Sequence, residues 1–135
     1  MEFRELPVSG SYLIRLKPVS DARGFFARAF CEEEFTERGL CAQFIQTNLA
    51  YTRRAGTIRG LHYQVPPHEE VKLVRCIRGA VWDVCVDLRA DSPTYGQWTG
   101  TELSSENRDM LYVPAGCAHG YQTLRDDTEV LYSVS

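Results

Sequence analysis

The sequence predicts an all-β protein, built as a β-sandwich or small barrel with one short helix. A series of short segments is rich in β-branched and aromatic residues, and turn residues separate these segments. Only residues 31–39 carry helix signals, whereas an α/β fold needs helices between its strands. Short strands at this spacing are typical of sandwiches and barrels.

The predicted strands follow one another along the chain with few residues between them. They cover residues 11–17, 24–30, 42–50, 57–64, 71–79, 80–89, 96–104, 110–114, 120–124 and 128–134. In the predicted helix, three successive glutamates at 32–34 suit the positive end of the helix dipole. Arg38 suits the last turn, and Gly39 can end the helix. Gly79 is placed to turn the chain between two strands.

Length and charge limit the possible organisation and partners. The 135 residues are close to the commonest domain size and predict a single domain over residues 1–135. Fifteen basic and eighteen acidic residues give a net charge of −3, which argues against a nucleic-acid partner. The first residues have no apolar signal core, and no apolar run is long enough for a bilayer. We therefore expect no membrane partner.

The cysteines indicate a reducing compartment. There are five, an odd number, and none forms a C-x-x-C pair. Cys76 and Cys85 lie in apolar strand-like segments, where a free thiol behaves as a small hydrophobe. A disulfide scaffold or a cysteine zinc site is therefore disfavoured, and a cytoplasmic location is expected.

The clearest strand alternation lies in residues 81–89. One predicted face carries Trp82, Val84, Val86 and Leu88, and the other carries Val81, Asp83, Cys85, Asp87 and Arg89. The commoner interpretation of the second face is that its charges are solvated. The alternative is that they line the interior of a barrel, where charge is costly and is usually functional.

The segment "RGLHYQVPPHEEVKLVR", residues 59–75, is the best candidate for a site that moves protons. His62 lies at the end of a predicted strand, three residues after Arg59 and ten before Lys72. Neighbouring strands would bring these three side chains together. A neutral imidazole with a pKa of about 6.5 is a natural proton acceptor, and an adjacent ammonium favours an anion formed when the proton leaves.

The sequence alone indicates less about the roles of the other two histidines and of the last tyrosine. His119 follows "VPAGCA", and a proline–glycine corner could either hold it at a barrel mouth or form a simple turn; both interpretations weigh the same. Tyr132 lies in an apolar strand, where packing is the default role. His68, beside Pro67, is expected to be an exposed loop residue.

Arg23 and Arg28 flank "GFFA" and could grip a phosphate, although surface charge is the commoner case. The chain contains no G-x-x-x-x-G-K or G-x-G-x-x-G run, so no dedicated nucleotide loop is predicted.

A set of longer motifs carries a family resemblance. They are "RGFF" (23–26), "Q-T-N" (46–48), "RGLHYQ" (59–64), "KLVRCIRG" (72–79), "WDVCVDLR" (82–89), "SPTYGQW" (92–98), "ELSSENR" (102–108), "VPAGCAHGYQTL" (113–124) and "EVLY" (129–132). With these motifs the chain closely resembles the dTDP-4-dehydrorhamnose 3,5-epimerase family, from about "DARGFF" to its last residue. The resemblance implies a cupin-type jelly roll and epimerisation of a nucleotide-linked 4-keto-6-deoxy sugar.

The resemblance also implies roles for three residues in the chemistry. His62 would be the general base, Tyr132 the acid on the opposite face of the sugar, and Lys72 the partner of the enolate oxygen. A ketone at C4 acidifies the hydrogens at C3 and C5, so inversion needs a base, an acid on the other wall and an oxyanion partner.

Substrate binding and assembly follow from the same resemblance. Asp83 would orient His119. The substrate-binding residues implied by the family are Arg23, Phe26, Gln46, Asn48, Arg59 and His119. The family forms dimers by exchanging N-terminal strands and uses no metal or organic cofactor, so we expect a homodimer that binds a nucleotide-linked sugar, with dTDP as the expected nucleotide.

Two alternatives stay open. The first is a sugar-nucleotide-binding protein with weak or no turnover, because family members carry beyond the position of Ser135 an aspartate that orients the base. For His62 to have an orienting partner within this sequence, Asp87 or another carboxylate would have to replace that aspartate. The second is a metal-dependent cupin, since "P-x-G-x-x-H" at 114–119 matches half of the cupin metal motif. Its other half wants two histidines one residue apart, whereas this chain has His62-Tyr63-Gln64, so a metal site is disfavoured.

Overall fold

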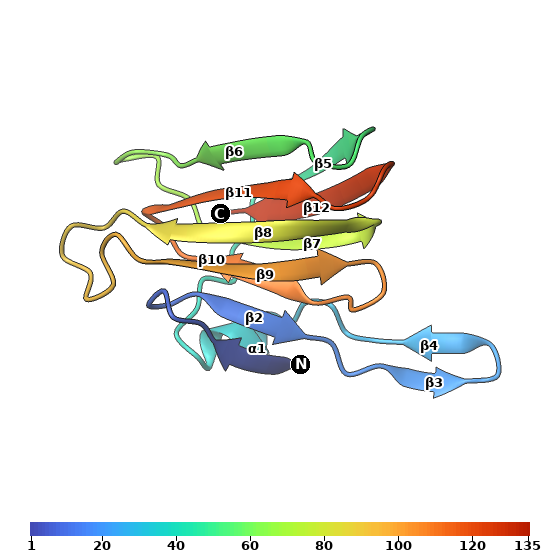
Figure 1. Cartoon of the computed structure of the whole chain (residues 1–135). Coiled ribbons are helices and arrows are strands. Elements are labelled where there is room, and N and C mark those ends of the chain that lie inside the picture. The colour runs from blue at the N-terminus through green and yellow to red at the C-terminus, as the bar shows by residue number, and fades with distance from the viewer.

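The computed structural model describes all 135 residues and shows two antiparallel sheets packed face to face, with a hairpin that extends away from them (Figure 1). The elements are β1 (Glu2–Glu5), β2 (Tyr12–Arg15), β3 (Val19–Asp21), β4 (Gly24–Phe26), α1 (Glu32–Thr36), β5 (Gln46–Thr52), β6 (Ile58–His62), β7 (Lys72–Arg78), β8 (Ala80–Asp87), β9 (Trp98–Ser104), β10 (Met110–Val113), β11 (Cys117–Thr123) and β12 (Thr128–Val134). The predicted all-β class with one short helix is confirmed.

Each sheet joins strands that are far apart in the sequence. The larger sheet has the order β1-β2-β10-β7-β12-β5, and the smaller has the order β6-β11-β8-β9. β3 and β4 pair only with each other. Consequently β5 and β6, which are neighbours in the sequence, are edge strands of opposite sheets.

Every predicted strand overlaps an observed one, but several boundaries differ. β4 ends at Phe26, whereas the prediction continued to residue 30, because Ala27 and Ala29 instead pack on the outer face of the larger sheet. β11 begins at Cys117, three residues before its prediction. β1 and β3 were not predicted, because "EFRE" and "VSD" lack an apolar run and owe their extended form to pairing with β2 and β4.

The helix forms where it was predicted, over Glu32–Thr36. Its first turn carries the three glutamates, and Gly39 follows with a positive φ of 69°. The Gly39 and Leu40 amides donate to the carbonyls of Thr36 and Phe35, which closes the C-terminal end. Arg38 lies beyond the last turn rather than in it, and its guanidinium bonds the Glu34 carbonyl.

Two apolar clusters hold the layers together. The first fills the space between the sheets and includes Val74, Val81, Leu103, Leu111 and Val130. The second covers the outer face of the larger sheet, where the fully buried Phe35 of α1 packs beside Ile14, Leu40, Met110 and Tyr112. Gly79 makes the tight link between β7 and β8 with a φ of 76°, as predicted.

The polar face of β8 points into the protein. Asp83, Cys85 and Asp87 are buried, whereas Trp82 on the other face is 42% exposed. The interpretation of a solvated polar face is therefore wrong, and the interior interpretation holds. Since a buried carboxylate is costly without partners, each aspartate must be compensated locally.

Asp87 is compensated by a dense set of donors at the end of β8. Arg89 donates through Nε and Nη2 to the two carboxylate oxygens at 2.8 Å each, and its amide donates at 3.0 Å. The hydroxyls of Ser92 and Thr94 donate to Oδ2. These bonds, led by the one from Arg89, hold the pKa of Asp87 well below its ordinary value. Arg89 also donates to the carbonyl of Ser9, which ties the N-terminal segment to this loop.

No helix in the structure has the length and apolar character needed to cross a membrane.

We predict that Asp87→Asn lowers the free energy of unfolding at neutral pH by about 3 kcal/mol, because it breaks a buried charge pair. Because the pKa of Asp87 is lower in the folded than in the unfolded protein, its ionised carboxylate stabilises the fold above the unfolded pKa of about 3.9. This stabilisation is lost progressively as the pH falls below that value. The difference between wild type and variant should therefore shrink as the pH falls from about 4. Urea unfolding across pH measures it, with the exposed Asp91→Asn as the control. A constant difference, or equal effects of the two variants, would contradict this account.

Candidate active site

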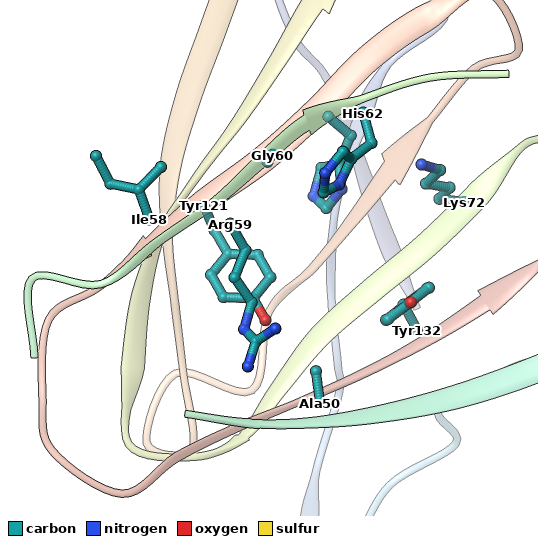
Figure 2. A pocket seen from close by; sticks show the side chains of 10 residues that line it. Ala50, Ile58, Arg59, Gly60, His62, Lys72, Tyr121 and Tyr132 are labelled. Atoms are coloured by element: carbon teal, nitrogen blue, oxygen red, sulfur yellow. The ribbon is translucent and has the colours of Figure 1, made fainter. Parts of the chain in front are cut away.

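A pocket of about 350 Å³ opens between the two sheets, and Figure 2 shows its lining. Strands β6 and β11 of the smaller sheet form one wall, and β5, β7 and β12 of the larger sheet form the other. The lining residues are Ala50, Ile58, Arg59, Gly60, His62, Lys72, His119, Gly120, Tyr121 and Tyr132. The structure thus brings together five of the predicted site residues: Arg59, His62, Lys72, His119 and Tyr132.

His62 and His119 are direct register partners on β6 and β11. Two glycines allow the strands to approach so closely. A Cβ on Gly60 would lie 2.7 Å from the carbonyl oxygen of His119, and a Cβ on Gly120 would lie 2.5 Å from that of Arg59. Gly60 also has a φ of 102°, which a residue with a side chain rarely adopts.

His119 is held by a buried carboxylate. Its Nε2 lies 2.8 Å from Oδ1 of Asp83, and since an ionised carboxylate only accepts, the imidazole donates. Both side chains are buried, and Oδ2 of Asp83 has no partner. The histidine is therefore fixed by one strong contact, and its Nδ1 is free of that bond.

Lys72 and Tyr132 come from the larger sheet and face the smaller one across the pocket (Figure 2). The ammonium of Lys72 lies 3.2 Å from the carboxylate of Glu70, although the residue is only 7% exposed. His62 and Tyr132 thus stand on opposite sheets, with a cation on the Tyr132 side. An acid–base pair arranged in this way can act on both faces of one substrate.

Arg59 is anchored on the neighbouring sheet. Its Nε donates to Oγ1 of Thr52 at 2.9 Å, and its Nη2 donates to the carbonyl of Tyr51 at 3.0 Å. These two bonds leave Nη1 free to contact an anion in the pocket.

Tyr121 lines the pocket but was not predicted as a site residue. It lies two residues after His119, so strand alternation places both side chains on the same face of β11. This two-residue spacing from His119 was the sequence feature that could have predicted Tyr121 as a pocket residue. Burial raises the pKa of Tyr121, so its phenol stays protonated at neutral pH.

Gln46 and Asn48 lie on β5 beside the pocket rather than in its lining. Asn48 is the direct register partner of Tyr132, so its side chain lies on the same face of the sheet. The Gln46 amide donates to Oδ1 of Asn48 at 2.8 Å. With Ala50 on the same face of β5, these residues extend the pocket wall along the edge of the larger sheet.

The structure does not bring Arg23 and Phe26 to this pocket. Both lie on the β3–β4 hairpin, which extends away from the sheets in Figure 1. Phe26 is 76% exposed, and Arg23 pairs only with Asp21 of the same hairpin. Arg28 pairs with Glu34.

Three further expectations concern Asp87, His68 and a metal site. Asp87 is fully engaged with Arg89 and the nearby hydroxyls, so it does not orient His62. His68 is exposed in the loop after β6, as predicted. The structure contains no group of three histidine, cysteine or carboxylate side chains that could hold a metal ion, so no ligand set supports the metal-dependent alternative.

Taken together, the fold and the pocket define a β-sandwich protein whose two sheets bring a histidine, a lysine and a tyrosine to one cavity. A sequence profile of the dTDP-4-dehydrorhamnose 3,5-epimerase family matches residues 5–135. The dTDP-4-dehydrorhamnose 3,5-epimerase of Sinorhizobium fredii is 45% identical over 135 residues, which cover 100% of this chain and 69% of that protein. The chain belongs to the dTDP-4-dehydrorhamnose 3,5-epimerase family and is an isomerase of that type.

Solved structures of the same family have the same fold as this chain. The crystal structure of the Elizabethkingia anophelis epimerase superposes with a TM-score of 0.96 at 40% identity, over 99% of this chain and 73% of that one. The Legionella pneumophila enzyme, solved in complex with dTDP-4-keto-L-rhamnose, superposes with a TM-score of 0.90 at 36% identity, over 98% and 70%. The fold is therefore the cupin-type β fold of these enzymes, and the chain spans about two thirds to three quarters of their length.

Proposed function

We propose that the chain epimerises a nucleotide-linked 4-keto-6-deoxy sugar at C3, at C5 or at both, as a step of deoxysugar biosynthesis. One observation carries the proposal: His62 and Tyr132 face a common pocket from opposite sheets, and Lys72 lines the same pocket. The relatives' names, and the dTDP-sugar bound in the Legionella structure, support dTDP as the nucleotide of the substrate.

The chemistry uses one base, one acid and one cation. His62 removes a proton from the carbon next to the C4 ketone, and the negative charge moves to the C4 oxygen. The ammonium of Lys72 stabilises this enolate, because opposite charges attract more strongly at a buried group than in water, and Lys72 is buried. Tyr132 then delivers a proton from the other face, which inverts the carbon. His119, fixed by Asp83, and Arg59 hold the sugar and the phosphate of the substrate beside these groups.

The nucleotide is proposed to lie along the edge of the larger sheet. Asn48 and Gln46 present amides there, next to Tyr132. Arg59 would contact the diphosphate through its free Nη1.

We infer further that two copies assemble so that the β3–β4 hairpin of each reaches the pocket of the other. The family resemblance assigns Arg23 and Phe26 to substrate binding, yet both are exposed on a hairpin outside their own pocket. A second copy would bring them to a pocket and would also cover the apolar surface of the hairpin.

A cytoplasmic location is proposed with this function. All five cysteines are free, which suits a reducing compartment.

Deuterium wash-in tests the activity. We expect the protein to exchange the C3 or C5 hydrogens of dTDP-4-keto-6-deoxyglucose with deuterium from heavy water. NMR spectroscopy measures this exchange. His62→Ala should slow the exchange by about 10²- to 10⁴-fold, the usual contribution of a general base. His68→Ala, an exposed histidine in the next loop, is the matched control and should keep the wild-type rate. If wild type exchanges neither hydrogen, the proposed activity fails and the nucleotide-sugar-binding alternative is favoured.

Mixed dimers test the shared site. We expect His62→Ala and Arg23→Ala proteins each to be impaired alone, since one lacks the base and the other a substrate contact. After unfolding and refolding together, half of the dimers should be mixed, each with one intact site, so about a quarter of wild-type activity should return. If each hairpin served its own pocket, the mixed dimers would have no intact site and no activity would return.

A further inference from the structure

Glu70 is the carboxylate that neutralises the buried ammonium in the pocket. Its Oε1 lies 3.2 Å from Nζ of Lys72, and this is the only ion pair that Lys72 makes. Lys72 is 7% exposed, and its register partners on the flanking strands are Val113 and Val134, which offer no side-chain acceptor. The buried carboxylate of Asp83, on the opposite sheet, is bonded to His119.

A lysine in this position needs a partner. Its ammonium is a compact charge on a four-carbon stem with several rotatable bonds, so the side chain alone does not define where the charge sits. A buried ammonium without a counter-ion is also costly, and the stem would tend to turn the charge toward water. The contact with Glu70 opposes that movement.

The backbone around Glu70 is itself fixed. The amide of Val71 donates to Oγ of Ser135 at 2.9 Å, and the amide of Ser135 donates to the carbonyl of Val71 at 3.1 Å. This pair joins the residue between Glu70 and Lys72 to the end of β12, the strand that carries Tyr132. The backbone between Glu70 and Lys72 is therefore tied to the residue that follows the strand of the proposed acid.

We propose that Glu70 is a positioning residue for the reaction, which holds the ammonium of Lys72 in the pocket where the C4 oxygen becomes an enolate. This inference rests on the proposed function. The carboxylate occupies one face of the ammonium, whose three N–H donors leave others for the substrate oxygen. Because Glu70 acts through Lys72 and not on the nucleotide, its loss should lower kcat more than it changes KM.

The chain offers a direct readout, since Lys17 and Lys72 are its only lysines and Lys17 is exposed. An acylating reagent followed by peptide mass spectrometry gives the reactivity of Lys72 relative to Lys17, without any need for activity. In wild type we expect Lys72 to react slowly. In Glu70→Ala the freed amine should react several-fold faster relative to Lys17, and in Glu70→Gln the increase should be smaller, because the amide still accepts a hydrogen bond.

Kinetics supply the second readout. We expect Glu70→Ala to lower kcat about tenfold or more, as misplaced groups do, with KM within about twofold of wild type. The control is Glu69→Ala, a neighbouring exposed glutamate that makes no ion pair, which should match wild type in both readouts. In a Lys72→Ala background, Glu70→Ala should cause no further loss, because the residue then has nothing to position.

The outcomes separate the two proposals. If Lys72 reactivity in Glu70→Ala equals that of wild type and of Glu69→Ala, Glu70 does not position Lys72 and the inference is overturned. An additive loss in the Lys72→Ala background would also overturn it, because Glu70 would then act independently of Lys72. If wild type shows no hydrogen exchange, the proposed function fails, while the lysine labelling still decides whether Glu70 holds Lys72.

Discussion

The close contact between β6 and β11 is the constraint on which the site depends. β6 is an edge strand with exposed side chains, and β11 is its only neighbour in the sheet. The contact is possible because Gly60 and Gly120 carry no Cβ where the opposite backbone lies. It fixes His62 beside His119 and points both toward the larger sheet, where Lys72 and Tyr132 stand. A shift of β6 by one residue would turn His62 to the outside.

Buried charge is the second constraint, and the protein handles it in pairs. Asp83 bonds His119, Asp87 bonds Arg89, and Lys72 pairs with Glu70. Only the Asp87 pair is satisfied by many additional donors, and it ties loops together at the end of the smaller sheet. The other two pairs lie at the pocket and have unused capacity: Oδ2 of Asp83 lacks a partner, and Lys72 has donors to spare. This difference separates the pair that ties loops together from the two pairs that lie at the pocket.

The sequence alone predicted the strands well because their apolar alternation is local. It missed β1 and β3, whose residues are mostly polar and become extended only through a partner strand. The two faces of β8 were separable by alternation, but which face is buried depends on long-range packing, and the commoner expectation of a solvated polar face was wrong.

For the site, family motifs located His62, Lys72, His119 and Tyr132, which the fold gathers from β6, β7, β11 and β12. The contact between Glu70 and Lys72 was not predicted, because a glutamate in a proline-containing loop has no pattern that points to a partner. The separation of Arg23 from the pocket was not predictable either, since it depends on where the hairpin projects and on what a second copy would add.

The central claim is that inversion needs two opposed walls, with the base on β6 and the acid on β12. The most direct measurement follows exchange and inversion separately in Tyr132→Phe, by recording deuterium content and configuration at C3 and C5 in the same sugar. With the base intact and the acid removed, the account predicts that deuterium still enters through His62 while inversion falls far below the wild-type rate. Inversion at the wild-type rate in this variant would place the acid elsewhere and contradict the account.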